Sequence, residues 1–147
     1  NNMNLLFALL LIFSNPSDKI KIVDPWMRVG AEGQATGLFF KIENHSDKAD
    51  TLYKVDFELA GKVEIHETYD AGNDMMGMRE VKQIVIPSKS SFELKPGAHH
   101  VMLMKLKQDI KKGYVGDVTL YFKQAGKIMI KAEAKDMMKK QTMEHQH

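Results

Sequence analysis

Residues 100–106 of the chain read HVMLMKL, with Val101 and Leu103 at every second position. Such alternation is typical of a β-strand with one face on an apolar core, because successive side chains point to opposite sides of a strand. The opposite face is expected to carry His100, Met102, Met104 and Leu106. His100 and Met102 are two positions apart, roughly 6–7 Å between Cα atoms, which is close enough for one ion to bridge them.

The same kind of pattern extends outward from this segment over most of the chain. In residues 62–68 (KVEIHET), Val63 and Ile65 fall on one face and His66 on the other, beside charged neighbours. Turns that contain glycine or proline separate the apolar segments. We predict strands at Ile20–Val29, Thr36–Glu43, Thr51–Leu59, Lys62–Thr68, Met78–Ile86, Ser90–Leu94, His100–Leu106, Asp117–Lys123 and Lys127–Ala134. Short strands at near-regular spacing favour an all-β fold, an antiparallel Greek-key sandwich or barrel.

Composition narrows the function classes. The chain has 147 residues, 44% of them hydrophobic and 27% charged, which describes one globular domain. The formal net charge is only +2 and the basic residues are scattered, so we expect no nucleic-acid partner. There is no cysteine and there are eleven methionines. The absence of thiolates excludes thiolate zinc sites, iron–sulfur clusters, cysteine nucleophiles and blue-copper sites, and leaves thioether and imidazole as soft ligands.

The N-terminal segment differs from the rest of the chain. Residues 5–13 (LLFALLLIF) form an apolar run that matches the core of a secretory signal and is about half as long as a membrane span. We therefore expect residues 1–18 to be an export signal and leader, and we expect no stable membrane span. A buried first strand is the alternative, but five leucines and a single β-branched residue suit a signal helix better.

Histidine and methionine together indicate copper. A thioether is a soft, neutral ligand that holds Cu(I) well and binds Zn(II), Ca(II) and Mg(II) poorly, whereas imidazole binds copper in either oxidation state. The candidates are His66, His100 and Met102 on the less apolar strand faces, and the methionines of residues 74–79 (DMMGMR). The alternative is that these methionines fill gaps in an ordinary core and that the histidines are incidental surface residues.

The spacing of these residues resembles that of a known family. Eleven residues separate His66 from Met78, twenty-one separate Met78 from His100, and one separates His100 from Met102. This spacing is similar to the H(M)x10Mx21HxM signature of the periplasmic copper chaperones called PCuAC. Family-like surroundings are found in residues 24–28 (DPWMR), 63–67 (VEIHE) and 94–97 (LKPG).

The resemblance implies a fold, a ligand set and a function. The fold would be a cupredoxin-like Greek-key β-sandwich over residues 19–134. The site would bind one Cu(I) through His66, Met78, His100 and Met102. Members of the family deliver copper for assembly of the binuclear copper centre of cytochrome c oxidase, alongside a Sco-type thioredoxin-like assembly factor. The chain is therefore expected to be a periplasmic copper chaperone and not an enzyme.

Other functions remain as alternatives. Periplasmic copper sequestration or resistance needs the same site but no receiving protein. A Greek-key interaction module would need no metal at all. A metalloenzyme is disfavoured, because a site with two thioether ligands is poorly suited to Lewis-acid chemistry on water.

Several neighbouring residues are auxiliary candidates. Met104 shares the predicted ligand face, and Met75 or Met76 could take the place of the first methionine ligand. Glu67 stands where the family often has methionine, and it would leave a carboxylate near the site. His99 is expected at the rim, facing away from the ligand face.

The C-terminal segment contains a second group of the same ligand types. Residues 135–147 (KDMMKKQTMEHQH) lack alternation and are predicted to form a flexible tail. Its candidate ligands are Met137, Met138, Met143, His145 and His147. Histidines favour Cu(II), so we predict a second site, for Cu(II), in this tail. A solvated tail without metal is the alternative.

Overall fold

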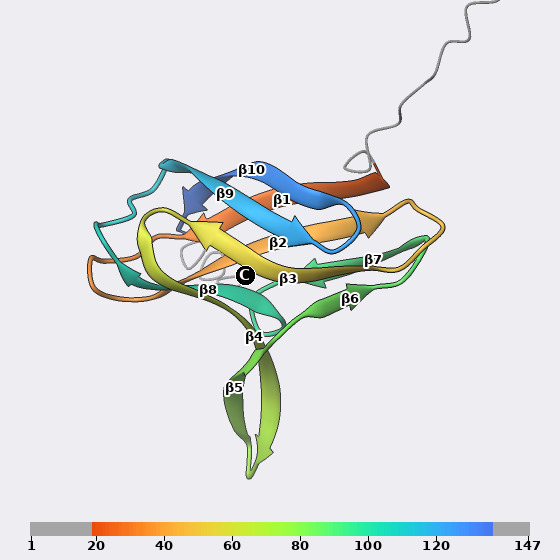
Figure 1. Ribbon diagram of the computed structural model, residues 1–147. Helices are drawn as coiled ribbons and strands as arrows, with labels where there is room; N and C mark the ends of the chain where they lie inside the picture. Colours follow the sequence, from red (N-terminus) through yellow and green to blue (C-terminus); the bar gives the residue numbers. More distant parts are fainter. Residues whose placement is uncertain (1–18, 137–147) are drawn as a thin grey trace, which may run out of the picture.

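The computed structural model describes residues 19–136, which form ten strands and no α-helix (Figure 1). The all-β prediction is confirmed. No helix within these residues is long and apolar enough to cross a membrane. The predicted leader and the ligands predicted in the tail lie outside the described residues. The strands are β1 (Ile20–Arg28), β2 (Thr36–Asn44), β3 (Asp50–Phe57), β4 (Ala60–Gly72), β5 (Met75–Val81), β6 (Ile84–Ile86), β7 (Ser90–Leu94), β8 (His100–Leu106), β9 (Val115–Phe122) and β10 (Gly126–Lys135).

One hydrogen-bonded sheet contains these strands. Its order is β5-β4-β8-β2-β1-β10-β9-β3-β6, and β7 pairs with β2 beside this path. Among the described strands, β1 and β10 run parallel and the other pairs run antiparallel. The sheet curves until β3 approaches β4, so its two halves face each other across one core (Figure 1). The Greek-key connectivity stays a prediction.

The core fixes the strand that carries two of the candidate ligands. Leu38, Phe40 and Ile42 of β2 are at most 2% exposed. Strand β2 is buried along most of its length because it lies between β1 on one side and β7 and β8 on the other. Val101 and Leu103 of β8 belong to the same core, as their alternation predicts. Their burial leaves the opposite face of β8 free for polar and sulfur-containing side chains.

The alternation in β8 breaks before its last residue. Lys105 has a φ of 51°, in the left-handed region, and its side chain is exposed. Leu106 is consequently 2% exposed and belongs to the core. The prediction that Leu106 shares the face of His100 is therefore wrong. A left-handed residue that is not glycine is uncommon, and a pattern of apolar residues does not reveal it.

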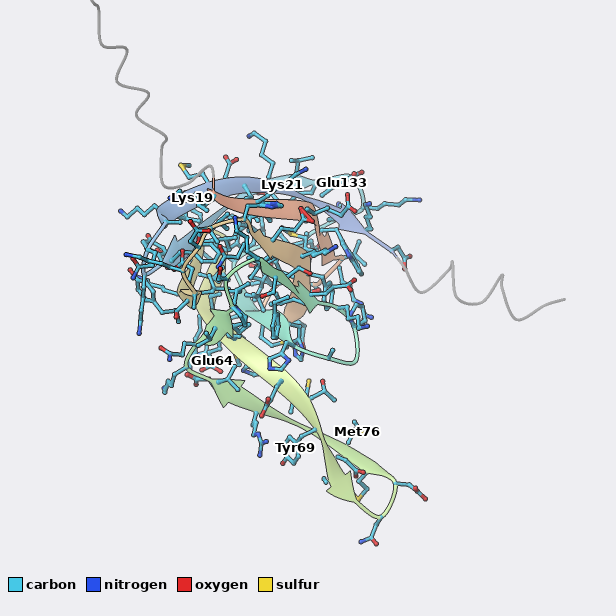
Figure 2. The ribbon with its side chains drawn as sticks, turned by 90° about the vertical axis from the view of Figure 1, so that its right-hand side faces the viewer. Lys19, Lys21, Glu64, Tyr69, Met76 and Glu133 are labelled. Atoms are coloured by element: carbon cyan, nitrogen blue, oxygen red, sulfur yellow. The ribbon has the colours of Figure 1, made fainter. Side chains whose placement is uncertain are left out.

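The β4–β5 hairpin projects beyond the body of the sheet (Figures 1 and 2). Its turn residues Asn73 and Asp74 have φ values of 54° and 59°, the left-handed conformations that a two-residue type I′ turn needs. The single strand predicted over residues 78–86 is two strands in the structure. Because β5 pairs with β4 and β6 pairs with β3, the chain changes partners at Lys82 and Gln83.

Candidate metal centre

Two histidines lie directly opposite each other on adjacent antiparallel strands. His66 of β4 pairs with His100 of β8, and two positions along the same ladder Glu64 pairs with Met102. The centroids of the two imidazole rings are 5.8 Å apart. Cross-strand partners point to the same side of a sheet, so both histidines and Met102 share one face. The pairing of β4 with β8 thus brings together two segments that the sequence analysis identified separately.

His100 is held in one orientation by the backbone. The residue is 6% exposed, and its Nδ1 lies 2.9 Å from the carbonyl oxygen of Ala98. A carbonyl oxygen only accepts a hydrogen bond, so Nδ1 carries the proton and Nε2 keeps its lone pair. Burial lowers the pKa of His100, against the hydrogen bond to Ala98, and the nearby His66, His99 and Arg28 add to the lowering. His100 therefore presents a neutral Nε2, the form of imidazole that binds a metal.

His66 is held by a carboxylate instead. Its Nε2 lies 2.7 Å from Oε2 of Glu64, and Nζ of Lys62 lies 2.8 Å from Oε1 of the same carboxylate. Hydrogen bonds from Lys62 and then from His66 lower the pKa of Glu64 to about 2. At neutral pH the carboxylate is ionised and can only accept, so Nε2 of His66 carries the proton. Its Nδ1 is buried and has no hydrogen-bond partner, and this is the atom that holds the lone pair when the ring is neutral.

The two free nitrogen atoms fit a metal ligand set. A buried polar atom without a partner costs free energy unless something binds it. Nδ1 of His66 is such an atom, and Nε2 of His100 keeps its lone pair because Nδ1 of the same ring donates to Ala98. Imidazole nitrogen is a good copper ligand. The role of Glu64 was not predicted from the sequence. The available signal was its position two residues before His66, on the same strand face.

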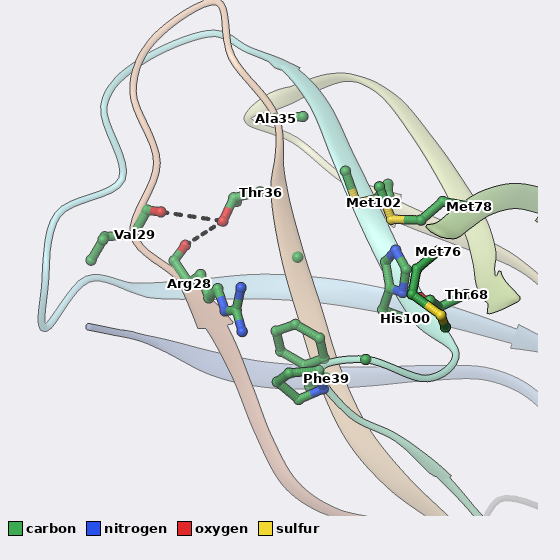
Figure 3. A pocket seen from close by; sticks show the side chains of 13 residues that line it. Arg28, Val29, Ala35, Thr36, Phe39, Thr68, Met76, Met78, His100 and Met102 are labelled. Atoms are coloured by element: carbon green, nitrogen blue, oxygen red, sulfur yellow. Dashed lines mark hydrogen bonds between the residues drawn. The ribbon is translucent and has the colours of Figure 1, made fainter. Parts of the chain in front are cut away.

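Methionines face this site from two strands (Figure 3). Met102 and His100 of β8 and Met76 and Met78 of β5 line one pocket of about 570 Å³. Met78 pairs with Thr68 and therefore lies on the same face of the hairpin as His66. His66 itself does not line the pocket but lies beside it, against the ring of His100. Met76 and Met78 are 65% and 59% exposed, so a molecule in solution can contact these residues.

The other auxiliary methionines lie outside this pocket. Met75 follows the hairpin turn, and by alternation its side chain lies on the face opposite to Met76. Met104 pairs with Lys62, further along the ladder from the histidines. Neither Met75 nor Met104 is among the described residues that line the pocket. The structure therefore brings Met76, and not Met75, close to the predicted ligands.

The opposite face of the hairpin carries an ionic cluster. Glu67 contacts Arg79, and its Oε2 lies 3.3 Å from Nε2 of His99. The expectation that Glu67 leaves a carboxylate near the site is wrong, because alternation along β4 turns this side chain away. Glu64 is the carboxylate beside the imidazole rings. His99 faces away from the pocket, as predicted.

Comparisons with known proteins agree with the fold. Residues 20–134 match the family described as "Putative lipoprotein LpqE-like". The curated relative "Putative lipoprotein Lxx21020" of Leifsonia xyli subsp. xyli is 27% identical over 121 residues, which cover 82% of this chain and 72% of that protein.

Solved structures of PCuAC domains superpose on the chain. The "Copper-bound PCuAC domain from PmoF2" is 29% identical with a TM-score of 0.67, covering 80% of this chain and 92% of that one. The solution structure of CuI-DR1885 from Deinococcus radiodurans is 26% identical with a TM-score of 0.60, covering 78% of each chain. The family match spans nearly all of the described residues, and the chain therefore belongs to the LpqE-like family, which is the family of the PCuAC domains.

Proposed function

We propose that this chain is a copper chaperone that carries one Cu(I) between Nδ1 of His66, Nε2 of His100 and the sulfur atoms of Met78 and Met102. The observation that supports it most is the pairing of two histidines, each with a free ring nitrogen, on the face that also carries the two thioethers. Two relatives of the same fold are described as copper-bound and as CuI-loaded.

The ligand types suit a cargo that must be released. Two imidazoles and two thioethers are neutral, and the soft sulfur atoms favour Cu(I) over Zn(II) or Mg(II). Thiolates would hold Cu(I) more tightly, and the chain has no cysteine. Copper is therefore bound selectively by methionine and histidine, and it stays available to a receiving protein.

The burial of the ligands suggests a direction for the transfer. His66 and His100 are held by Glu64 and by the backbone at Ala98; the His66 side chain is 13% exposed and His100 is 6% exposed. Met78 is 59% exposed on the projecting hairpin. An acceptor can thus approach from the methionine side, replace a thioether first, and leave the two imidazoles on the metal until its own ligands are in place.

We further propose the cellular role that the family resemblance implies. The acceptor is the cytochrome c oxidase subunit that carries the binuclear copper centre, and a Sco-type thioredoxin-like assembly factor acts beside it. Residues 1–18 direct export, so the chain works in the periplasm, and it is not an enzyme. The tail residues Met137, Met138, Met143, His145 and His147 bind a second copper as Cu(II).

An anaerobic titration tests the site. The protein is titrated with Cu(I) against a chromophoric chelator, and we expect saturable binding that the double variant His66→Ala/His100→Ala lacks. Met129→Leu is the matched control, since Met129 is 74% exposed on β10 and does not line the pocket. No saturable binding in the parent chain, or undiminished affinity in the double variant, contradicts the proposed site.

Two further experiments test the role. Loaded protein is mixed with the copper-free soluble domain of the oxidase subunit, and copper should move to that domain; complete retention would favour sequestration instead. For the tail, the three methionines are replaced by leucine and the two histidines by alanine in the full chain. Cu(II) uptake should fall while the Cu(I) affinity stays, and an unchanged Cu(II) stoichiometry excludes the tail site.

A further inference from the structure

The pocket beside the copper ligands contains one charged side chain, Arg28, among the described residues that line it. Its guanidinium lies over the ring of Phe39, with 5.5 Å between Cζ and the ring centroid (Figure 3). Its Nε is buried and has no hydrogen-bond partner. No carboxylate within residues 19–136 forms an ion pair with it. The pocket therefore holds an unpaired cation and, within its described lining, no acidic group.

An unpaired cation is costly beside a second positive charge. The proposed ligands are neutral, so bound Cu(I) keeps its full charge in the same pocket as Arg28, and like charges repel more strongly where water is partly excluded. Arg28 and the proposed ligands Met78, His100 and Met102 line the same pocket. A guanidinium does not lose its proton in a protein, so the pocket cannot relieve the repulsion by titration. An anion that enters the pocket would relieve it.

The structure also fixes Arg28 in place. Oγ1 of Thr36 donates to the carbonyl oxygens of Arg28 and Val29, at 2.9 and 3.2 Å, which secures the end of β1. Trp26 lies against Phe39 with 4.6 Å between ring centroids, so the aromatic platform under the guanidinium is itself braced. The DPWMR segment that the sequence analysis noted therefore supplies both the platform support and the cation. A preorganised cation of this kind loses little entropy when it binds a partner.

We propose that this pocket docks an acidic side chain of the copper-accepting protein, whose carboxylate accepts hydrogen bonds from the Arg28 guanidinium while the acceptor's copper ligands reach the metal past Met78. The proposal rests on the proposed copper delivery. A guanidinium matches a carboxylate through two parallel hydrogen bonds, which fixes orientation as well as attraction. The strength of docking also depends on whether copper is bound, because the loaded pocket has one more positive charge than the empty one. The acceptor thus prefers the loaded chaperone and leaves after transfer.

Copper transfer to the copper-free soluble domain of the oxidase subunit tests the proposal. Arg28→Gln removes the charge, and we expect the second-order rate constant to fall about tenfold or more and to depend less on salt. Arg28→Lys keeps the positive charge but cannot form two parallel hydrogen bonds to a carboxylate. Its rate constant should therefore lie between those of the parent and Arg28→Gln. Lys21→Gln removes the same charge from an exposed position at the other end of β1 (Figure 2) and should stay within about twofold of the parent.

The Cu(I) affinity of each variant is measured together with its transfer rate, so that a docking defect is separated from a copper-binding defect. The Cu(I) affinity of Arg28→Gln should not fall, because the change removes a positive charge from beside the metal. A parental transfer rate in Arg28→Gln overturns the proposal, and so does a loss of Cu(I) affinity, which would make Arg28 a support for the ligands. If Arg28→Gln fails to fold, a parental rate in Arg28→Lys overturns the bidentate contact.

A test that needs no copper transfer distinguishes failure of the docking proposal from failure of the proposed copper delivery. If the parent chain transfers no copper, binding of a tetraglutamate peptide to the loaded chain is measured by calorimetry, with tetraglutamine as control. Binding that Arg28→Gln abolishes supports the acidic docking site, and absence of binding in the parent overturns it. Neutralising Asp136 and Glu144 should leave the transfer rate unchanged. If these changes abolish the effect of Arg28→Gln, the occupant is the chain's own C-terminal segment and the proposal is wrong.

Discussion

The body of the sheet and the β4–β5 hairpin contribute to the same site in opposite ways. In the body, β8 is anchored by Val101 and Leu103, which are fully buried, and its proposed ligand His100 is 6% exposed. On the hairpin, Met76 and Met78 are 65% and 59% exposed, and the strand pair extends away from the core (Figure 2). The body thus carries the proposed nitrogen ligand in a fixed orientation, and the hairpin carries methionine side chains that are exposed to solvent.

This difference assigns separate tasks to the two ligand types. A ligand held by packing and hydrogen bonds costs little entropy to order on binding, so the histidines should account for most of the affinity. An exposed thioether is weakly constrained and can be displaced by an incoming ligand, so the methionines should govern selectivity for Cu(I) and the rate of exchange. The following changes test this division, from the largest expected effect to the smallest.

Removal of a histidine should have the largest effect. His100→Ala deletes a preorganised ligand, and we expect the Cu(I) affinity to fall about 100-fold or more, beyond the usual effect of losing a group that only supports a ligand. The measurement is anaerobic competition with a chelator, with His45→Ala as control, since His45 is exposed and pairs with Glu43 away from the pocket. A fall of less than about threefold would show that the body does not supply the affinity.

Replacement of the hairpin sulfur should have a smaller effect on affinity and a larger one on exchange. Met78→Leu keeps the approximate volume but removes the thioether, and we expect about a tenfold loss of Cu(I) affinity together with weaker discrimination against Zn(II). Met75→Leu makes the same change on the opposite face of the hairpin and should have no effect. Equal losses from both variants would mean that the face of the hairpin does not matter.

Weakening the support of His66 should have a still smaller effect. Glu64→Gln keeps an acceptor oxygen for the Nε2–H group of His66 but removes the negative charge of the carboxylate. We expect Cu(I) binding to weaken by about 1 kcal/mol, or roughly fivefold in affinity. Nitrogen chemical shifts of the imidazole report the tautomer directly, and we expect the variant to lose its strict preference for the proton on Nε2. An unchanged tautomer together with unchanged affinity would remove Glu64 from the site.

The metal-free protein should show the Glu64 interaction through its acid stability. The pKa of Glu64 is lowered to about 2 by Lys62 and His66, so its contribution to folding is present above the ordinary carboxyl pKa of 4.5 and is lost as the pH falls towards 2. The difference in Tm between the parent and Glu64→Gln should therefore shrink between pH 5 and pH 2. A constant difference over this range would contradict the assigned pKa.

The sequence predicted the strand faces of His66, His100 and Met102 better than it predicted where strands begin and change partners. Alternation correctly placed Val101 and Leu103 in the core and His100 on the other face, because a strand's period depends only on local geometry. It failed at Leu106, where the left-handed backbone of Lys105 reverses the alternation. It also merged β5 with β6, since the change of partner is decided by tertiary pairing and not by local pattern.

The residues around the proposed ligands were harder to predict than the strand faces on which those ligands lie. Glu67 was expected beside the site from its place in the motif, but Glu64 makes the contact to the imidazole. Arg28 reaches the pocket only because β1 pairs with β2, which in turn pairs with β8. Spacing can suggest ligands that lie close together in the fold, whereas the residues around them depend on the order of strands in the sheet.

The central claim is that one Cu(I) is bound by two imidazole nitrogens and by the sulfur atoms of Met78 and Met102. The most direct test is X-ray absorption spectroscopy of the full chain loaded anaerobically with less than one equivalent of Cu(I). We predict two nitrogen and two sulfur neighbours in the parent, and loss of both sulfur neighbours in Met78→Leu/Met102→Leu. A parent spectrum without sulfur, or an unchanged sulfur shell in the double variant, would contradict the claim.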